Sequence, residues 1–293
     1  MVPKITYIGR FAPSPTGLLH LGSLVAAIAS YCEAIKNNGK WLVRIEDLDP
    51  PREVTGASTK IIEVLNKLGF VFEQQITFQS NPMRQAAYQV ALDKLIELSA
   101  IYYCTCSRKQ LKNTTLQAHQ CRQNYDIPSS AYSINLKVPN KTIEFTDAIQ
   151  GHQQYHLQKN CGDFIIKRKD GLFSYQIAVV VDDAFQNITN IIRGIDLIES
   201  TPWQVYLNLL LNYKQPSYGH IPILVDNAGH KLSKQTFAEE IESQDPLTIL
   251  LSAHSYLNQT PFIQKPQNIK QFWQHTITHW DLNKIAKVEA IKV

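Results

Sequence analysis

The chain has 293 residues, of which 44% are hydrophobic and 18% are charged, and 29 basic against 25 acidic side chains give a net charge of +4. This composition excludes collagen-like, low-complexity and disordered classes. No apolar run approaches the roughly 20 residues that a membrane span requires. The first residues lack the apolar segment of a signal peptide, so we expect a cytoplasmic protein with no membrane partner. The small positive excess favours a polyanionic partner only weakly.

The first hundred residues alternate strand and helix signals. Apolar residues recur at helical spacing from Leu24 to Ile35, and Asn81-Pro82 has the cap and first-turn proline of another helix. This alternating order is typical of a parallel α/β sheet, which is the fold class that we predict. The expected elements are a strand at 5–8, a turn-rich loop at 9–17, a helix from His20, a strand at 41–45, and helices over 61–68 and from 82.

After about Tyr102 the sequence becomes rich in β-strand signals. The dipeptide Asp170-Gly171 between two apolar runs is typical of a hairpin turn. We therefore expect an inserted β-rich module, then a return to the sheet. The expected elements are strands at 134–138, 164–168, 172–175 and 191–194, a helix from Thr201, and three short helices that begin near Asp245, Pro266 and Asp281.

A first candidate motif lies at residues 10–23, which read RFAPSPTGLLHLGS, between the first strand and the first helix. Amides at a helix start and the positive end of the helix dipole attract anions, so a phosphate can bind there. His20 and Ser23 are candidate donors to phosphate oxygens, and Gly22 lets a flat ring approach the backbone. The alternative is a Pro- and Gly-rich turn in which a histidine only caps the helix.

A second candidate motif lies at Lys231-Leu232-Ser233-Lys234-Gln235, after an apolar strand signal and a turn. Two lysines three residues apart on a loop provide mobile positive charges that suit a triphosphate. Taken alone, this pentapeptide is more typical of a solvated basic loop, and only its combination with the first motif favours a binding role.

In this order on an α/β chain, the two segments resemble the signature motifs of the class I aminoacyl-tRNA synthetases. That family has His-Ile-Gly-His in the first motif and Lys-Met-Ser-Lys-Ser in the second. The chain differs at Ser23, where the family has histidine, and at Gln235, where it has serine, but a hydroxyl still donates to phosphate and both lysines are present. Residues 44–52 and 192–197 are similar to the glutamyl and glutaminyl branch, and the resemblance covers roughly residues 5–240.

The resemblance implies a nucleotide-binding domain of the class I type with an inserted β-rich module and a short C-terminal helical region. Only about sixty residues follow Lys234, which we expect to be too few for an anticodon-binding domain. The implied parts are a first half of the nucleotide-binding domain at 1–101, an acceptor-binding module with a zinc site at 102–173, a second half with the lysine-containing loop at 174–235, and a helical tail at 236–293.

With so short a C-terminal region, the chain resembles the truncated paralogues of glutamyl-tRNA synthetase, which join glutamate to queuosine in the anticodon loop of aspartate tRNA. The implied reaction forms glutamyl-adenylate from L-glutamate and ATP and then transfers the glutamyl group, and we expect a monomer. Two alternatives remain from the residues: ordinary glutamylation of a tRNA 3′ end, and a tRNA-binding paralogue without catalytic activity. The retained His20, Lys231 and Lys234 argue against the second.

By the same resemblance, His20, Lys231 and Lys234 are the catalytic residues, which stabilise charge on the phosphates. Glu46 is expected to face the ammonium group of glutamate, and Arg193 to place two N–H donors on its side-chain carboxylate. Singly, each is more simply a strand-end carboxylate in an ion pair or a surface arginine. The implied sets are Arg10, Ser14, Glu46, Tyr175 and Arg193 for glutamate and His20, Gly22, Ser23, Lys231, Ser233 and Lys234 for ATP, which binds with Mg²⁺.

Cys104, Cys106 and Cys121 lie close together in the sequence, and three thiolates are one short of the four ligands of structural zinc. The resemblance implies a tyrosine as the remaining ligand, four residues before the last cysteine, where this chain has Gln117. His119 is the better donor by chemistry, although it is only two residues from Cys121. We expect one Zn²⁺ here; the alternative is three reduced thiols that pack without a metal.

Overall fold

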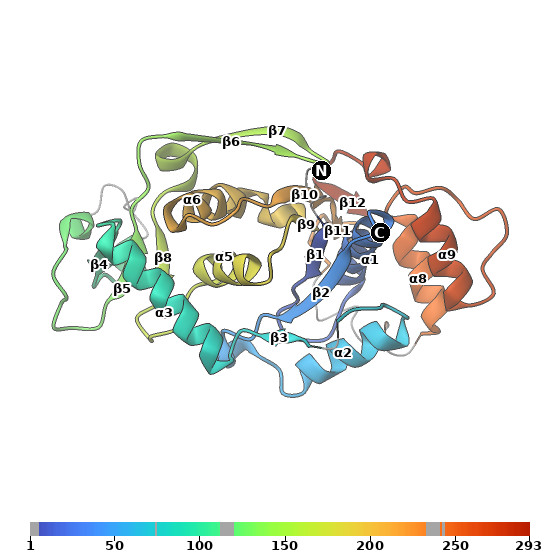
Figure 1. Ribbon diagram of the computed structural model, residues 1–293, viewed down its shortest axis with the longest axis horizontal. Helices are drawn as coiled ribbons and strands as arrows, with labels where there is room; N and C mark the ends of the chain where they lie inside the picture. The colour runs from blue at the N-terminus through green and yellow to red at the C-terminus, as the bar shows by residue number, and fades with distance from the viewer. Residues whose placement is uncertain (1–5, 74, 112–119, 233–240, 242–243) are drawn as a thin grey trace.

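A largely parallel sheet crosses the middle of the molecule (Figure 1). The computed structural model describes residues 6–73, 75–111, 120–232, 241 and 244–293. The strands are β1 (Ile8–Phe11), β2 (Lys40–Ile45), β3 (Thr77–Phe78), β6 (Thr142–Asp147), β7 (Gly151–His156), β9 (Asn190–Gly194) and β10 (Ser217–Ile221). They are ordered β3-β2-β1 and β9-β10-β6-β7, and the two groups meet where the Ile8 amide donates to the Thr189 hydroxyl at 2.8 Å. Neighbouring strands run parallel except β6 and β7.

The first hydrophobic core surrounds α1 (Leu21–Lys36), which follows β1 and lies against β1, β2 and β9. The other helices of this core are α2 (Ala57–Lys67), α8 (Pro246–Ser255) and α9 (Ile269–Thr278). Figure 1 shows α8 and α9 beside α1, so the C-terminal helices share their core with the N-terminal strands.

Aromatic rings join the C-terminal helices to the sheet. The Phe70 ring lies 5.2 Å from Trp41 and 4.8 Å from Trp273, measured between ring centroids. Gly69, at the end of α2, has φ +77°, and a Cβ there would lie 2.7 Å from the Ile269 side chain. Only glycine satisfies both the backbone conformation and this close approach.

The second hydrophobic core lies at the opposite end of the molecule (Figure 1). Its helices are α3 (Pro82–Glu97), α5 (Tyr175–Phe185) and α6 (Thr201–Leu211). They pack with an antiparallel sheet of β4 (Ile101–Cys104), β5 (Ser133–Leu136) and β8 (Phe164–Lys167). The Asn81 side chain caps α3 by accepting from the Met83 amide at 2.9 Å, as the Asn-Pro dipeptide predicts.

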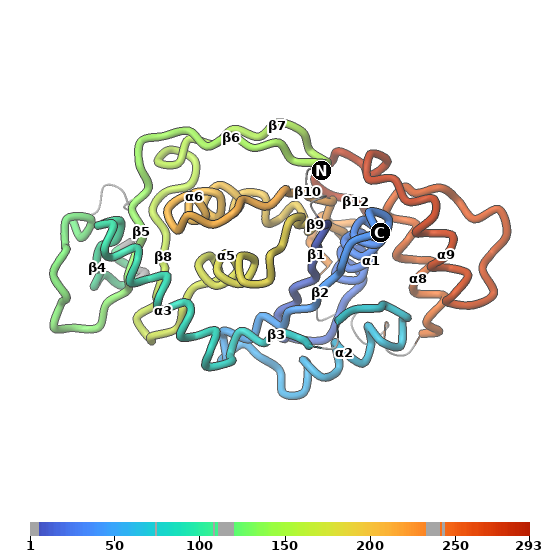
Figure 2. Tube along the Cα trace, viewed as in Figure 1, coloured from blue at the N-terminus to red at the C-terminus, as the bar shows by residue number. Residues whose placement is uncertain are grey.

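The long hairpin of β6 and β7 connects the two ends of the molecule. It is inserted between β5 and β8, and Figures 1 and 2 show it running from that sheet to the central one, where Tyr218 of β10 pairs with Asp147 of β6. Short helical segments flank these strands at α4 (Arg108–Leu111), η3 (Gln120–Gln123) and a π-helix (Leu157–Cys161). The expected strands at 134–138 and 164–168 correspond to β5 and β8 of one sheet, whereas β6 and β7 were not predicted and join the central sheet. The boundaries of the inserted module stay a prediction.

Two expectations about local structure need correction. The first strand is Ile8–Phe11 rather than 5–8, because pairing with β2 extends into Gly9 and Arg10, which the turn signals had assigned to a loop. The expected strand at 172–175 is reduced to a single bridge between Lys167 and Phe173, since Tyr175 already begins α5. Residues 177–181 form an unbroken apolar run, and its burial in the second core as part of α5 overrides the hairpin signal.

The C-terminal tail also holds a strand that the sequence did not predict. β12 (Ala290–Lys292) pairs in parallel with β11 (Ile223–Val225), and its three residues are too few to show a period of two. The expected short helices occur, with α8 capped by Asp245, α9 beginning after Asn268 instead of at Pro266, and a single turn at Leu282–Lys284. In the described part of the chain, no helix is both long and apolar enough to cross a bilayer.

Candidate active site

A cavity of about 430 Å³ opens at the carboxyl ends of β1, β2 and β9, beside the start of α1. Parallel α/β sheets bind their ligands at this end of the strands, and the volume is in the range of small-molecule sites. Of the predicted glutamate and ATP residues, Ser233 and Lys234 lie outside the described residues. The others all line the cavity: Arg10, Ser14, His20, Gly22, Ser23, Glu46, Tyr175, Arg193 and Lys231.

The start of α1 forms one wall of the cavity. His20 is the cap of this helix, and its Nδ1 accepts a hydrogen bond from the Ser23 amide at 3.3 Å. The neutral ring therefore carries its proton on Nε2, which is a donor. The first turn contains no acidic residue, so the positive end of the helix dipole faces the cavity uncompensated. The start of α1, which His20 caps, is therefore also a place where an anion can bind, so this wall of the cavity can bind a phosphate.

Glu46 follows β2 and lies on the floor of the cavity, with its side chain 7% exposed. Its Oε1 has no hydrogen-bond partner among the described residues, and Arg44 Nη2 is 3.6 Å away. Burial, the largest cause, raises the pKa of Glu46 to about 7, although Arg44 and Arg10 act in the opposite direction. A buried carboxylate at the cavity surface suits a ligand ammonium group.

A network of buried charges lies beneath this floor. Arg44 Nη2 is 2.8 Å from Asp183 Oδ1, and Arg10 Nε is 3.3 Å from the same oxygen. Asp182 accepts from Arg84 Nε at 2.7 Å. Burial raises the pKa of Asp183, but Arg10 and Arg44 outweigh it and the net shift is downward. The carboxylate is therefore ionised and fixes the Arg10 side chain at the cavity wall.

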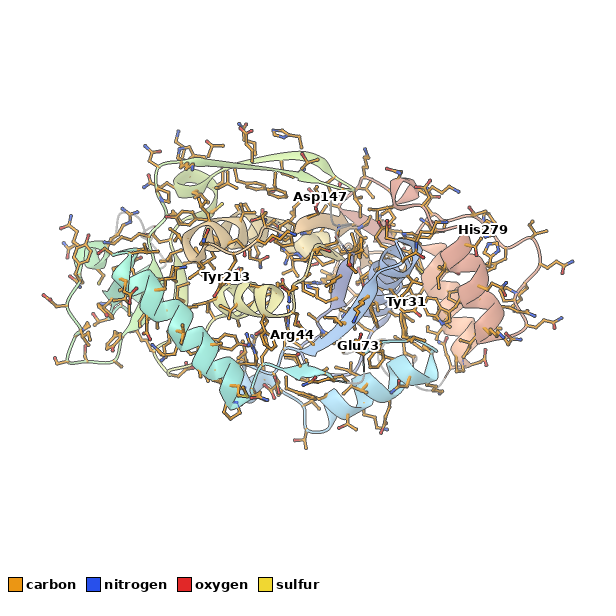
Figure 3. All side chains as sticks on the ribbon, viewed as in Figure 1. Tyr31, Arg44, Glu73, Asp147, Tyr213 and His279 are labelled. Atoms are coloured by element: carbon orange, nitrogen blue, oxygen red, sulfur yellow. The ribbon has the colours of Figure 1, made fainter. Side chains whose placement is uncertain are left out.

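Of this network, only Arg10 was predicted from the sequence as a substrate-binding residue. The available signal was the pair Asp182-Asp183 after an apolar run in α5, because buried carboxylates require cationic partners. Figure 3 shows Arg44 where β2 approaches α5, and its side chain is fully buried. The contacts among these charges depend on how the helices and strands pack, and no single contiguous motif contains all of them.

Arg193 is the penultimate residue of β9, and each of its three guanidinium nitrogens donates to a protein group. Nε donates to His220 Nε2 at 3.0 Å, while Nη2 donates to Thr201 Oγ1 at 2.9 Å and to the Leu197 carbonyl at 3.3 Å. Nη1 donates to the Tyr175 hydroxyl at 3.4 Å. The fork of two N–H donors expected of Arg193 stays a prediction. The Tyr175 hydroxyl accepts from Nη1 and keeps its own hydrogen to donate.

His220 and Asp147 lie behind Arg193 and were not named from the sequence. Both side chains are fully buried, and His220 Nδ1 is 2.5 Å from Asp147 Oδ2. Burial, the largest cause, lowers the pKa of His220 to about 4, and Arg193 adds to this shift while Asp147 opposes it. The ring is therefore neutral at pH 7. Figure 3 shows Asp147 where the β6–β7 hairpin approaches β10.

Lys231 lies at the rim of the cavity, just after β11. Its Nζ is 2.5 Å from Asp196 Oδ2, and the two side chains are 47% and 35% exposed. This ion pair is open to solvent, so the lysine can exchange the carboxylate for a phosphate at little cost. Its partner Asp196 was not named from the sequence, although it lies in the segment 192–197.

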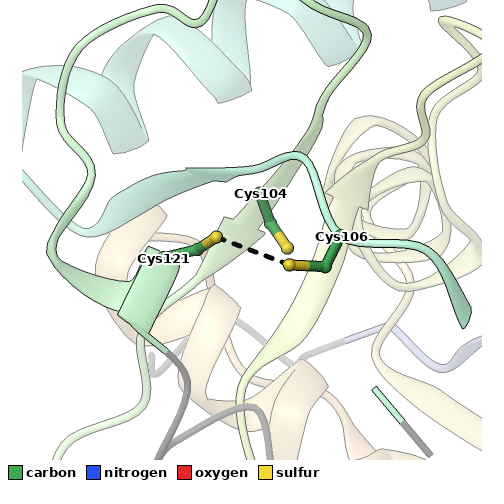
Figure 4. Close-up of side chains that lie close together, drawn as sticks. All are labelled: Cys104, Cys106 and Cys121. Atoms are coloured by element: carbon green, nitrogen blue, oxygen red, sulfur yellow. Dashed lines mark hydrogen bonds between the residues drawn. The ribbon is translucent and has the colours of Figure 1, made fainter. Parts of the chain in front are cut away.

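The sulfurs of Cys104, Cys106 and Cys121 converge at the end of β4 (Figure 4). All three lie within 4.8 Å of one another, and the sulfurs of Cys106 and Cys121 are 3.8 Å apart. Tetrahedral zinc with bonds of about 2.3 Å separates its sulfur ligands by about 3.8 Å. Burial raises the pKa of the Cys106 thiol to about 11, so a bound cation is what would make it a thiolate. Three thiols fit zinc; the candidates Gln117 and His119 lie outside the described residues.

Comparison with known families agrees with this site. Residues 7–246 match the model of the catalytic domain of class I tRNA synthetases, the type for glutamate (E) and glutamine (Q). The chain belongs to this family. The resemblance found in the motifs is thereby confirmed, as is the α/β fold with a parallel sheet. This class I synthetase is a ligase that uses ATP and tRNA as substrates.

Curated relatives of this class I synthetase cover nearly all of its length. The Glutamyl-Q tRNA(Asp) synthetase of Pseudomonas putida strain KT2440 is 46% identical over 255 residues, which are 87% of this chain and 84% of the relative. The protein of the same name from Pseudomonas aeruginosa strain PAO1 is 43% identical over 284 residues, 96% of each chain.

Solved structures share the fold of this class I synthetase. The glutamate-tRNA synthetase of Elizabethkingia anophelis superposes with a TM-score of 0.81 at 23% identity, over 98% of this chain and 68% of that one. The methionyl-tRNA synthetase of Mycobacterium tuberculosis gives a TM-score of 0.53 at 9% identity, over 85% of this chain and 64% of that one. These similarities show the fold alone.

Proposed function

We propose that this enzyme activates L-glutamate with ATP and transfers the glutamyl group to queuosine in the anticodon loop of tRNA(Asp). One observation carries the choice of amino acid: the buried carboxylate of Glu46 and the Arg193–Tyr175 pair line the same cavity. An ammonium group and a side-chain carboxylate complement these two sites. The name of the relatives, 43–46% identical over most of the chain, supports the acceptor.

The amino-acid end of the cavity binds glutamate by charge. Glu46 accepts from the ammonium group, while Arg193 Nη1 and the Tyr175 hydroxyl donate to the side-chain carboxylate. Arg10, held by Asp183, and Ser14 complete this end. Glutamine lacks the negative charge that Arg193 requires, so the pocket selects the acid over its amide.

The other end of the cavity binds ATP. His20, Gly22 and Ser23 place the start of α1 against the phosphates, and the loop with Lys231, Ser233 and Lys234 supplies positive charge. Mg²⁺ enters with the nucleotide and neutralises part of the phosphate charge. A glutamate carboxylate oxygen forms a bond to the α-phosphorus, the bond from that phosphorus to the bridging oxygen breaks, and pyrophosphate leaves. Positioning and charge stabilisation supply the catalysis, with His20 and Lys234 acting on the transition state.

In the second step a hydroxyl oxygen of the modified nucleoside attacks the activated carbonyl carbon. The bond between that carbon and the phosphate oxygen breaks, AMP leaves with the electron pair, and the hydroxyl proton is released. Unpaired loop bases can be splayed out and recognised individually, so an anticodon loop can reach the adenylate directly. A monomer suffices for this reaction, since one chain contains both ends of the cavity.

The cysteine cluster is proposed to bind one structural Zn²⁺ through Cys104, Cys106 and Cys121, with Gln117 or His119 as the candidates for the fourth position. The metal would supply cross-links between β4 and the segment around Cys121, with no part in the chemistry of the cavity. Elemental analysis of the purified protein should find zinc near one equivalent per chain. A metal-free preparation that keeps its thermal stability and its exchange activity would show that the thiols only pack.

The test of the proposed function is charging with labelled glutamate. Without tRNA, glutamate should support ATP–pyrophosphate exchange; exchange only after addition of tRNA would indicate an ordinary glutamyl-tRNA synthetase. Queuosine-containing tRNA should accept the label and queuosine-free tRNA should not. An isolated anticodon stem-loop with queuosine should also be labelled. Label at the 3′ end of intact tRNA would support ordinary glutamylation instead, and RNA binding without either reaction would indicate a non-catalytic paralogue.

A further inference from the structure

The buried pair of Asp147 and His220 contacts the residue that selects the substrate and does not line the cavity itself. Asp147 ends β6, His220 lies in β10 and Arg193 lies in β9, so three neighbouring strands bring one side chain each to a single chain of hydrogen bonds. His220 Nδ1 contacts Asp147 at 2.5 Å, and its Nε2 accepts from Arg193 Nε at 3.0 Å.

The hydrogen bonds determine which ring nitrogen of His220 carries the proton. Arg193 Nε is always a donor, so His220 Nε2 must accept and Nδ1 must hold the proton. Asp147 Oδ2 accepts that proton. The other oxygen of Asp147 accepts from the backbone amides of Ile149, Gln150 and His220 at 2.8–3.1 Å. The carboxylate is therefore anchored, and it imposes one tautomer on the ring.

We propose that His220 and Asp147 are positioning residues that set the orientation of the Arg193 guanidinium for the side-chain carboxylate of the substrate. The inference rests on the proposed function, in which Arg193 binds glutamate. With Nε held by His220 and Nη2 held by Thr201 and Leu197, rotation of the guanidinium is blocked and Nη1 is the nitrogen left beside Tyr175. The His220 ring thus affects substrate selection through the orientation of Arg193, and it does not contact the substrate.

Two substitutions at His220 test its hydrogen bond to Asp147 and its hydrogen bond from Arg193 separately. In His220→Gln the amide oxygen can reach the place of Nε2 and still accept from Arg193. In His220→Asn the shorter amide can reach only the place of Nδ1, so Arg193 Nε loses its acceptor. Loss of one charge-assisted hydrogen bond corresponds to about 10- to 100-fold, so the KM for glutamate should rise by that factor in His220→Asn and by much less in His220→Gln. The KM for ATP should stay within about twofold in both, since the ATP wall is separate.

Asp147→Asn tests the tautomer with almost no change in shape. The three backbone amides require an oxygen, so the new NH₂ group must face His220 Nδ1 and donate to it. The ring proton then moves to Nε2, where Thr201 Oγ1 at 3.3 Å is the available acceptor, and Arg193 Nε again loses its partner. The KM for glutamate should rise as in His220→Asn.

The readouts are ATP–pyrophosphate exchange with glutamate and ATP varied in turn, and ¹⁵N NMR of the histidine rings in the full chain. The spectra should show His220 protonated on Nδ1 in the wild type and on Nε2 in Asp147→Asn. His254→Asn is the matched control, because His254 is also buried, and burial lowers its pKa to about 4, but it packs in the α8–α9 core. That variant should lose stability and keep its KM for glutamate.

Folded His220→Asn and Asp147→Asn variants with an unchanged KM for glutamate would overturn the proposal and leave the pair a purely structural link between strands. An equal rise of both KM values would do the same, since it indicates general damage. A wild type without glutamate-dependent exchange would instead contradict the proposed function. The substrate part of the inference would then be wrong as well, and the ring spectra would still decide whether Asp147 sets the tautomer that faces Arg193.

Discussion

At the floor of the cavity the charged side chains are buried and held by buried partners, whereas at its rim they form a solvent-exposed ion pair. Arg44 is fully buried between Asp182 and Asp183, and the Arg10 side chain is 4% exposed. Lys231 at the rim is 47% exposed. Arg10 and Lys231 both present positive charge to the cavity, but Arg10 is fixed by buried partners and Lys231 is open to solvent.

The difference matches what each end must recognise. Glutamate differs from glutamine in a single group, so its binding residues must be fixed in place before it arrives. A triphosphate spreads its charge over many oxygens and moves during the reaction, which mobile lysines can follow. Fixed charges require buried partners, and buried partners make the floor sensitive to substitution in a way that the rim is not.

The largest effect is expected at the floor. Arg44→Met should lower the free energy of unfolding by about 3–5 kcal/mol, because it leaves Asp182 and Asp183 with fewer cationic partners in a buried site. Urea unfolding followed by tryptophan fluorescence measures this. The matched control is Lys40→Met in the same strand, whose pair with Glu73 is exposed and should contribute under about 1 kcal/mol. Equal losses in the two variants would contradict the comparison.

Lys234→Ala, a change in the same signature motif as Lys231, should act on rate instead of stability. A donor that meets charge developing in the transition state contributes about 2.7–4 kcal/mol, so kcat for pyrophosphate exchange should fall by about 100- to 1000-fold. The KM for glutamate should change little, since the glutamate residues lie at the other end. A higher KM at unchanged kcat would show that the lysine binds substrate and does not act on the reaction.

The contrast between floor and rim also explains what the sequence could show. His20, Ser23 and Glu46 belong to contiguous segments next to strand ends, and the fold brings such segments together by its topology alone. Asp147 and His220 are isolated residues in two strands, and their contact depends on how β6 pairs with β10. A local pattern cannot encode a contact between residues 73 apart, and so this part of the site required the structure.

Glu46→Gln should weaken glutamate binding through the loss of the charge that faces the ammonium group. The KM for glutamate should rise by about 10- to 100-fold, the range for a hydrogen bond between charged groups. The wild type should show a pH dependence that the variant lacks: burial raises the pKa of Glu46 to about 7, so the KM should fall as pH rises from 6 to 8. Exchange rates over this pH range measure both, with Glu73→Gln as an exposed control. A flat profile in the wild type would exclude Glu46 as the ammonium partner.

The same group gives a stability prediction of opposite sign. A carboxyl whose pKa is raised by folding binds its proton more tightly in the folded state, so its contribution to stability is present below about pH 4.5 and is lost as pH rises to about 7. Glu46→Gln should therefore be more stable than the wild type at pH 8 and nearly equal to it at pH 4.5. Thermal unfolding without substrate measures the difference; a variant less stable at pH 8 would mean that the ionised carboxylate stabilises the fold.

The smallest effect is expected at Asp196, the exposed partner of Lys231. In Asp196→Asn the lysine no longer has to leave a carboxylate when phosphate arrives, so the KM for ATP should fall by about two- to fivefold, equivalent to the ~0.3–1 kcal/mol of a surface ion pair. The free energy of unfolding should change by no more than this. The effect should diminish between 0.05 and 0.5 M salt, since solvent ions screen exposed charges and leave buried ones largely unaffected. Exchange kinetics at the two salt concentrations measure it. A rise in the KM for ATP would show that Asp196 takes part in binding the nucleotide, and the rim would then be as fixed as the floor.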